Sequence, residues 1–486
     1  MMDFEQSSRG TVVLLGATVV LAASYIVKKF LTNGVSSRPP PLVPSSIPFL
    51  GHAVSFGKHP IEFLFSAYKQ YGPVFSFRMV GKTFTFLVGS DAAATFFNSK
   101  NEDLNAEEVY GKLTTPVFGK GVAFDVPNEV FMEQKKILRT GLTITRFKKY
   151  VPKMQEETVE YFKRWGDSGE KDIFKALLEL TLLTASSCLQ GEEIRKNFEV
   201  EIAQLCRELD EGFNPMAWLL PAWLPLPSFR RRDAAHIKMK KIYYRIIAER
   251  RATSIKGEDM LQTLLDCRYK SGRGMTDEEV AGMLIAMLLA GQYTSTSASS
   301  WMCFFLAKHP NIQTALYEEQ IKIFGKDLRG LDYEGLKQCD LLERTVRETL
   351  RLKPPMTSIM RVCKSPVTVN GYTIPPGHQV CVSPAMNQRL KTTWENPLKF
   401  NPDRFVDENN PSNKEKYAYV PFGAGHHRCV GESFAYLQIK SIMASVLRLY
   451  ELQLVDDYFP ETDFTTLIHV PINPIIQYKR RASHMD

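Results

Sequence analysis

One cysteine of this chain lies in a setting that favours its thiolate form. Cys429 belongs to the Gly-rich segment 422–431, FGAGHHRCVG, which directly precedes a segment with helical periodicity at 432–449. Backbone N–H groups and the N-terminus of that helix would stabilise negative charge on the sulfur. Gly425 and Gly431 would let the backbone lie close to a flat partner. A thiolate in such a loop can ligate haem iron and favour O–O cleavage; the alternative is a buried structural cysteine, the usual role of a lone Cys.

Composition limits the class of protein. The 486 residues are 44% hydrophobic and include eight cysteines, with no CxxC pair and no C-x-x-C-H haem-attachment motif. Scattered cysteines are typical of a reducing compartment rather than of a disulfide scaffold. The net charge of +8 is concentrated in clusters, which suit an acidic protein partner or an anionic membrane, although solvated helix faces are an equally ordinary explanation. No nucleic-acid-binding motif is present, so nucleic acid is not expected as a partner.

The N-terminus predicts a membrane anchor. Residues 10–27 carry no charge, and at about 1.5 Å per residue they nearly cross the bilayer core; Phe30 and Leu31 extend the segment. Lysines follow it, whereas acidic residues precede it, so residues 1–9 would be lumenal and the rest cytosolic. We predict a transmembrane helix at 10–31, a stiff Pro-rich linker at 32–50 and one catalytic domain at 51–486. A cleaved signal peptide is the alternative, which the acidic n-region disfavours.

The remainder predicts a mainly α domain with small β-sheets. Alternating residues at 74–79 and 83–88 predict two strands, Asn370-Gly371 predicts a type I′ hairpin at 368–374, and 379–382 predicts another strand. A capping box at 276–279 opens a helix that should run to about Lys308. Within it, Gly291 and Thr294 predict a local kink, because the hydroxyl can compete for a freed carbonyl; close helix packing is the alternative reading of Gly291.

Three charged residues could form one cluster. Glu348 and Arg351 lie three residues apart on an amphipathic helix, 341–352, and therefore share one face. Arg404 follows in an aromatic-flanked loop. An isolated surface pair of this kind contributes little, but a bidentate Glu–Arg–Arg cluster would hold the loop that leads to Cys429.

Taken in this order, the Cys429 loop, Glu348 with Arg351, Arg404 and the segment Ala290–Ser295 resemble the cytochrome P-450 superfamily of haem-thiolate monooxygenases, over essentially the whole chain. The segment 110–125, YGKLTTPVFGKGVAFD, together with Gly291-Gln292, is similar to eukaryotic sterol 14α-demethylases. The resemblance implies the cytochrome P-450 fold, haem b, and removal of the 14α-methyl group of a lanosterol-, eburicol- or obtusifoliol-type sterol in three O2- and NADPH-dependent oxidations that release formate. It also implies an endoplasmic reticulum location and an NADPH–cytochrome P-450 reductase as electron donor.

The resemblance also implies roles for individual residues. Cys429 would be the iron ligand, and Thr294 would assist oxygen activation through its hydroxyl. Residues expected at the haem propionates are Tyr110, Lys135, Arg361 and His427. Residues expected to line an apolar sterol pocket are Leu113, Phe118, Phe124, Phe213, Ala286, Ala290, Ile359 and Ile468. Without the resemblance, most of these apolar residues would be read as ordinary core.

Three positions depart from the family pattern. Tyr293 stands where these demethylases usually have His, so proton delivery must differ, and we expect a link from the Tyr293 hydroxyl to Asp210. Phe124 replaces a common Tyr, and His426 replaces a common Arg. The segment 213–227 would dip into membrane lipid and admit substrate, or would be a packed loop. Alternative functions are a haem-thiolate hydroxylase that oxidises another lipid once, or a membrane protein that binds haem or sterol without turnover.

Overall fold

The computed structural model describes residues 38–196, 200–213, 220, 223–253 and 256–482. The predicted lumenal segment 1–9 and transmembrane helix 10–31 lie outside the described residues, as does the first part of the 32–50 linker. Among the described helices, one stretch is long and apolar enough to cross a membrane, Ile173–Gln190, and it is 67% buried within the protein. We therefore assign that stretch to the core.

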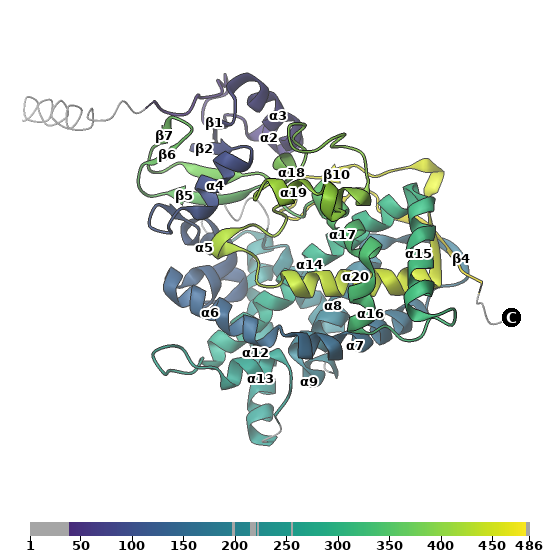
Figure 1. Ribbon diagram of the computed structural model, residues 1–486. Helices are drawn as coiled ribbons and strands as arrows, with labels where there is room; N and C mark the ends of the chain where they lie inside the picture. The colour runs from purple at the N-terminus through teal and green to yellow at the C-terminus, as the bar shows by residue number, and fades with distance from the viewer. Residues whose placement is uncertain (1–37, 197–199, 214–219, 221–222, 254–255, 483–486) are drawn as a thin grey trace, which may run out of the picture.

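Helices dominate the chain, and the longest of them crosses the molecule (Figure 1). The helices that surround the site or support it are α4 (Ser90–Asn98), α5 (Glu107–Phe118), α6 (Asn128–Gly141), α7 (Ile144–Phe162), α8 (Ile173–Ala185), α10 (Val200–Asp210), α12 (Pro227–Thr253), α13 (Met260–Asp266), α14 (Asp277–Lys308), α17 (Asp340–Leu352) and α20 (Glu432–Leu449). The others are α2 (Ala53–Lys58), α3 (Pro60–Tyr71), α9 (Glu192–Lys196), α15 (Pro310–Phe324), α16 (Tyr333–Gln338), α18 (Pro384–Asn387) and α19 (Pro411–Lys414). A large apolar core unites α7, α8, α12, α14 and α20.

Helix α14 begins as its sequence predicts. Thr276 is its N-cap, and the Thr276 hydroxyl and the Glu279 side chain form a reciprocal capping box. Glu279 also pairs with Arg273 and accepts a hydrogen bond from the Tyr269 hydroxyl. The helix is continuous to Lys308, so the predicted kink does not interrupt it. The Thr294 hydroxyl nevertheless bonds the Ala290 carbonyl at 2.7 Å, as the prediction required.

The small sheets also follow the predicted pattern. The largest has the strand order β1-β2-β8-β5-β3, made of β1 (Val74–Met79), β2 (Lys82–Leu87), β3 (Leu104–Asn105), β5 (Ile359–Cys363) and β8 (Gln379–Val382). β6 (Val367–Val369) and β7 (Tyr372–Ile374) form the expected hairpin, with positive φ at Asn370 and Gly371. A three-stranded sheet joins β4 (Ser168–Asp172), β12 (Ile475–Arg480) and β9 (Tyr450–Leu454), and β10 (Thr462–Asp463) pairs with β11 (Val470–Pro471). The prediction of a mainly α domain with small sheets is confirmed.

Candidate active site

The loop before α20 presents Cys429. Its backbone is shaped by Gly425 at φ +67°, where an added Cβ would lie 2.4 Å from the Phe97 carbonyl oxygen, and by a Cys429 N–H bond to the Phe422 carbonyl at 2.9 Å. Cys429 keeps accessible surface, yet desolvation raises the pKa of its thiol; a Gly431 backbone hydrogen bond and the Lys135 charge oppose that shift. Desolvation in this loop thus opposes the thiolate form, whereas the Gly431 hydrogen bond and the Lys135 charge favour it. A bound metal cation would deprotonate the thiol outright.

Three basic side chains, Lys135, Arg361 and His427, lie around this loop, and none of them forms an ion pair with a carboxylate of the described residues. Lys135 donates to the carbonyls of His426 (2.7 Å) and Arg428 (2.8 Å), and Arg361 donates to the Phe96 carbonyl at 2.6 Å. Desolvation lowers the pKa of Lys135 to about 8 and that of Arg361 to about 10. The pKa of His427 falls to about 3, first through desolvation and then through the charges of Arg361, His426 and Lys135. Such an arrangement suits an anionic partner.

Aromatic rings complete this side of the site. The Tyr110 hydroxyl accepts a hydrogen bond from the Met360 N–H at 3.0 Å, and burial raises its pKa to about 12. Phe124 packs against Tyr110 and Phe131, with ring centroids 5.0 and 4.8 Å apart. The rings of Phe124 and Phe131 also stack on His427. Phe124 therefore lies with Tyr110 and His427 and has no hydroxyl to offer there.

The chemistry of this donor set fits haem. Within the described residues, neither ring nitrogen of His427 has a hydrogen-bond partner although both are buried, and Arg361 and Lys135 bond only backbone carbonyls. Two carboxylates of a porphyrin edge would supply the missing acceptors. Cys429 offers the single sulfur ligand that haem-thiolate proteins use. The residues present therefore fit an iron porphyrin.

The middle of α14 supplies a second wall. Ala290 is exposed and Ala286 is half-buried in a helix whose residues are otherwise mostly buried. Thr294, one turn beyond Ala290, is also only half-buried. Small side chains at these positions leave room beside the helix, and Thr294 supplies a hydroxyl there.

Tyr293 and Asp210 meet as predicted. A side-chain hydrogen bond joins the Tyr293 hydroxyl on α14 to the Asp210 carboxylate at the end of α10. Desolvation raises the pKa of Asp210 to about 7, although the bond from Tyr293 opposes the rise. Burial and the nearby carboxylate raise the pKa of the Tyr293 phenol well above its usual range. Asp210 is therefore the group of this pair that titrates near neutral pH, while the phenol of Tyr293 stays protonated.

The remaining predicted pocket residues lie on different elements. Leu113 of α5 packs in an apolar cluster with Phe229 and Phe213, and Phe118 meets Phe213 with ring centroids 5.4 Å apart. Ile359 starts β5, and Ile468 lies in the turn between β10 and β11; both are half-buried. In the predicted lipid-facing segment 213–227, Trp223 is 79% exposed, while Trp218 and Leu219 lie outside the described residues.

The predicted Glu–Arg–Arg cluster is present, with Glu348 and Arg351 buried and Arg404 half-buried. Arg351 makes a bidentate pair with Glu348 at 2.6 and 2.8 Å, and the Arg404 Nε lies 3.3 Å from the same carboxylate. Both arginines also donate to backbone carbonyls of the loop 395–399. The cluster therefore fixes that loop, and Gln388, which Arg351 also contacts, bonds the Val420 N–H just before the cysteine segment.

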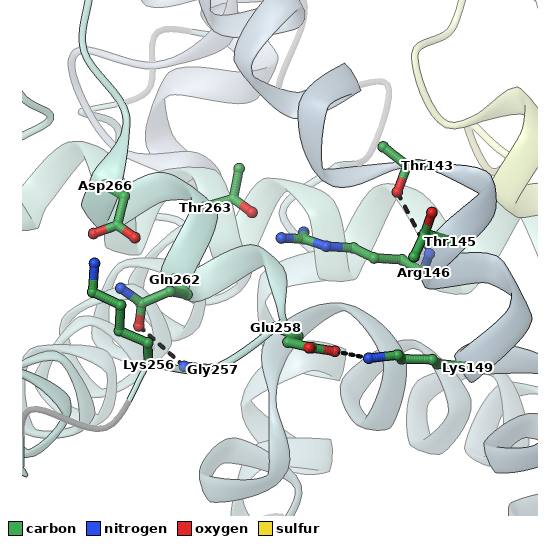
Figure 2. A pocket seen from close by; sticks show the side chains of 10 residues that line it. All are labelled: Thr143, Thr145, Arg146, Lys149, Lys256, Gly257, Glu258, Gln262, Thr263 and Asp266. Atoms are coloured by element: carbon green, nitrogen blue, oxygen red, sulfur yellow. Dashed lines mark hydrogen bonds and ion pairs between the residues drawn. The ribbon is translucent and has the colours of Figure 1, made fainter.

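A separate surface hollow of about 310 Å³ lies between the start of α7 and the segment 256–266 (Figure 2). Polar and charged side chains line it, and the ion pair of Lys149 with Glu258 spans part of it. None of its lining residues is a predicted site residue. A polar hollow of this kind does not suit a rigid apolar substrate.

Two supporting residues were not predicted. Gln134 bonds the Gly121 carbonyl, the Ala123 N–H and the Tyr269 hydroxyl, so it connects the loop after α5 to the start of α14. His469 contacts α14 and the segment after α17. Neither residue belongs to a local motif, and their partners are far away in the sequence, so sequence patterns carried no signal for them.

Comparisons with known proteins agree on a family. Residues 40–477 match the family model described as cytochrome P-450. The chain is 61% identical over 95% of its length to the curated lanosterol 14-alpha demethylase of Mus musculus, covering 91% of that protein, and 60% identical to that of Homo sapiens, covering 90% of it. The relative from Mycosarcoma maydis is 38% identical over 95% of this chain and 91% of its own length. Among solved structures, retinoic-acid-bound cyanobacterial CYP120A1 matches with a TM-score of 0.82 at 25% identity, over 92% of this chain and all of that one.

Proposed function

We propose that this chain, which belongs to the cytochrome P-450 family, is a sterol 14α-demethylase that oxidises the 14α-methyl group of a lanosterol-type sterol three times and leaves a Δ14 double bond. Membership of the family makes it a haem monooxygenase that uses O2. The observation that carries the sterol assignment is 60 to 61% identity over 95% of the chain to curated lanosterol 14-alpha demethylases. Leu113 resembles the residue of the animal and fungal members of this family, where plant-type members tend to carry Phe, and this agrees with a substrate that carries two methyl groups at C4.

The residues around Cys429 support the cofactor assignment. Cys429 would hold the iron, and Arg361, Lys135, His427 and Tyr110 would hold the propionate edge. When bound, haem supplies oxygen activation, which no side chain of the protein can perform. The protein's part is to hold that group between α14 and the loop before α20, and to exclude competing water.

Proton supply falls to side chains of α14 and α10. The Thr294 hydroxyl, now donated to the Ala290 carbonyl, can turn to donate toward the space beside Ala290. Asp210, with a pKa of about 7, can take a proton from solvent and share it with Tyr293 through their hydrogen bond. A carboxyl that titrates near working pH is the efficient choice for proton transfer. We propose that Tyr293 and Asp210 replace the histidine-based route usual in this family.

The apolar residues support a sterol as the substrate. A sterol is rigid and has one polar end, so its site should be aliphatic and aromatic with few polar anchors. Leu113, Phe118, Phe213, Ile359 and Ile468 meet that requirement from four separate elements.

We further propose the setting of the reaction. NADPH electrons would arrive through NADPH–cytochrome P-450 reductase, and the protein would be anchored by residues 10–31 in the endoplasmic reticulum membrane. The sterol substrate partitions into lipid, so a membrane position would bring the enzyme to its substrate. The Pro-rich linker 32–50 would connect that anchor to the catalytic domain 51–486.

Reconstitution tests the proposed function. The full chain in lipid vesicles with the reductase and NADPH is given lanosterol, eburicol and obtusifoliol in parallel. We expect a Δ14 sterol and formate in equal amounts. A stable 14α-alcohol as the final product, or NADPH-dependent oxidation of another lipid only, would favour the single-step hydroxylase. Binding of lanosterol without NADPH consumption would indicate a non-catalytic sterol-binding protein.

A further inference from the structure

One buried histidine outside the cofactor residues joins three walls of the site. His469 is 6% exposed and is the last residue of the turn between β10 and β11. Its backbone carbonyl accepts the Ser297 hydroxyl of α14 at 2.5 Å, and its N–H donates to the Pro355 carbonyl at 2.8 Å. Both main-chain groups of His469 therefore form hydrogen bonds with other segments rather than within the hairpin.

The imidazole ring also bonds the segment after α17. Its Nε2 bonds the Thr357 hydroxyl, and the ring also bonds the Pro354 carbonyl. Desolvation lowers the pKa of His469 to about 4, so the ring is neutral and can donate from one nitrogen while it accepts at the other. The Thr357 carbonyl is itself held by the Ser383 hydroxyl at 2.6 Å. The anchor of His469 is therefore fixed on both sides.

The position of His469 relates these bonds to the substrate. Ile468, its neighbour in the chain, is a predicted pocket residue, and Ile359 lies two residues after Thr357. Ser297 lies three residues after Thr294, about 4.5 Å farther along the same helix. His469 therefore ties the turn that carries Ile468 to the wall that carries Thr294 and to the strand that begins with Ile359.

The other end of the same turn has its own attachment. Lys353 donates to the Thr462 hydroxyl of β10 at 2.6 Å and lies 3.8 Å above the centre of the Trp301 ring. Lys353 thus holds one end of the turn and His469 holds the other. Only the His469 end adjoins a pocket residue.

We propose that His469 is a positioning residue for the sterol: it holds Ile468 at a fixed distance from Thr294 and Ile359, so that the same methyl group faces the haem through successive oxidations. This inference rests on the proposed function. A misplacement of about 1 Å in a positioned substrate can cost on the order of 100-fold in rate. Three consecutive oxidations of one carbon make the enzyme especially sensitive to such misplacement, because intermediates escape whenever the sterol shifts.

The test uses His469→Phe in the full chain, which keeps a planar aromatic ring, somewhat larger than imidazole, and removes the ring hydrogen bonds. The matched control is His378→Phe, because His378 also bonds a threonine, Thr85, at 2.8 Å, but between β2 and the start of β8. We measure the Soret shift produced by saturating lanosterol, kcat and KM for the Δ14 product, and the fraction released as 14α-alcohol or aldehyde. The reduced CO spectrum reports intact haem-thiolate ligation.

We expect H469F to keep the CO spectrum, to lower the lanosterol-induced Soret shift at saturation, to reduce kcat about tenfold, and to release intermediates. H378F should change none of these. Ser297→Ala, a smaller change at the other end of the connection, should release intermediates in the same direction, which covers the case in which H469F does not fold. If H469F and S297A release no more intermediate than H378F, the positioning proposal is wrong. If the wild-type protein itself makes no Δ14 product, the proposed function fails first, and the inference falls with it.

Discussion

Replacement of Glu348 by Gln should sharply destabilise the domain. The Glu348 carboxylate is fully buried and accepts four hydrogen bonds, from Arg351 Nε (2.6 Å) and Nη2 (2.8 Å), Arg404 Nε (3.3 Å) and the Asn401 N–H (2.9 Å). The amide keeps the shape but leaves two guanidinium charges without a counter-charge. Removal of one partner from a buried ion pair costs about 3 to 5 kcal/mol, a large part of a total stability of roughly 5 to 15 kcal/mol.

The measurement is urea unfolding of the purified chain, with the haem Soret band as a second reading. The matched control is Asp340→Asn on the same helix. Asp340 pairs with Arg344 but is 74% exposed, so its loss should cost about 1 kcal/mol or less. If E348Q does not accumulate, Arg404→Lys keeps the charge but loses the fork to the 395–399 carbonyls, and should show an intermediate loss. Equal stability of E348Q and D340N would refute this reasoning.

Three further changes test other parts of the site. Cys429→Ser should abolish the red-shifted Soret band of the reduced CO complex and all NADPH-dependent turnover; an unchanged spectrum would remove Cys429 as the ligand. Asp210→Asn should remove a pH dependence of stability that the raised pKa of Asp210 creates. The folded wild type holds a proton up to about pH 7 that the unfolded chain releases near pH 4, so the free energy of unfolding of the wild type falls as the pH rises between these values. Urea unfolding at pH 5 and pH 8 should show that fall in the wild type but not in the variant. Gly425→Ala places a Cβ 2.4 Å from the Phe97 carbonyl at φ +67°; the strained backbone alone costs about 1 to 2 kcal/mol, which haem occupancy after purification at rising temperature should reveal.

Local patterns predicted the elements and the charged cluster. The capping box at Thr276 and the Asn370-Gly371 turn each depend on neighbouring residues only, and the structure reproduces both. The Glu348 cluster could also be predicted from the sequence, because two of its members lie three residues apart on one helix. In these cases the physical cause is local, so sequence alone can show it.

Long-range contacts set the limit of prediction. The Tyr293–Asp210 bond joins segments more than eighty positions apart in the numbering, and only the family resemblance suggested it. The pKa of Cys429 also depends on how deeply the fold desolvates the sulfur, which raises that pKa and which the loop sequence does not encode. The bonds of His469 are set by tertiary packing and had no counterpart in any motif.

Adjacent residues of α6 link two distant parts of the molecule. Gln134 connects toward the start of α14 through Tyr269, whereas Lys135 bonds the carbonyls of the cysteine loop. Two neighbouring helix positions point about 100° apart, so one turn of α6 serves both sides. The cysteine loop should therefore open only together with the beginning of α14, as one cooperative unit. Amide hydrogens in these two regions would then exchange with solvent at matching rates, despite the absence of regular secondary structure in most of the loop.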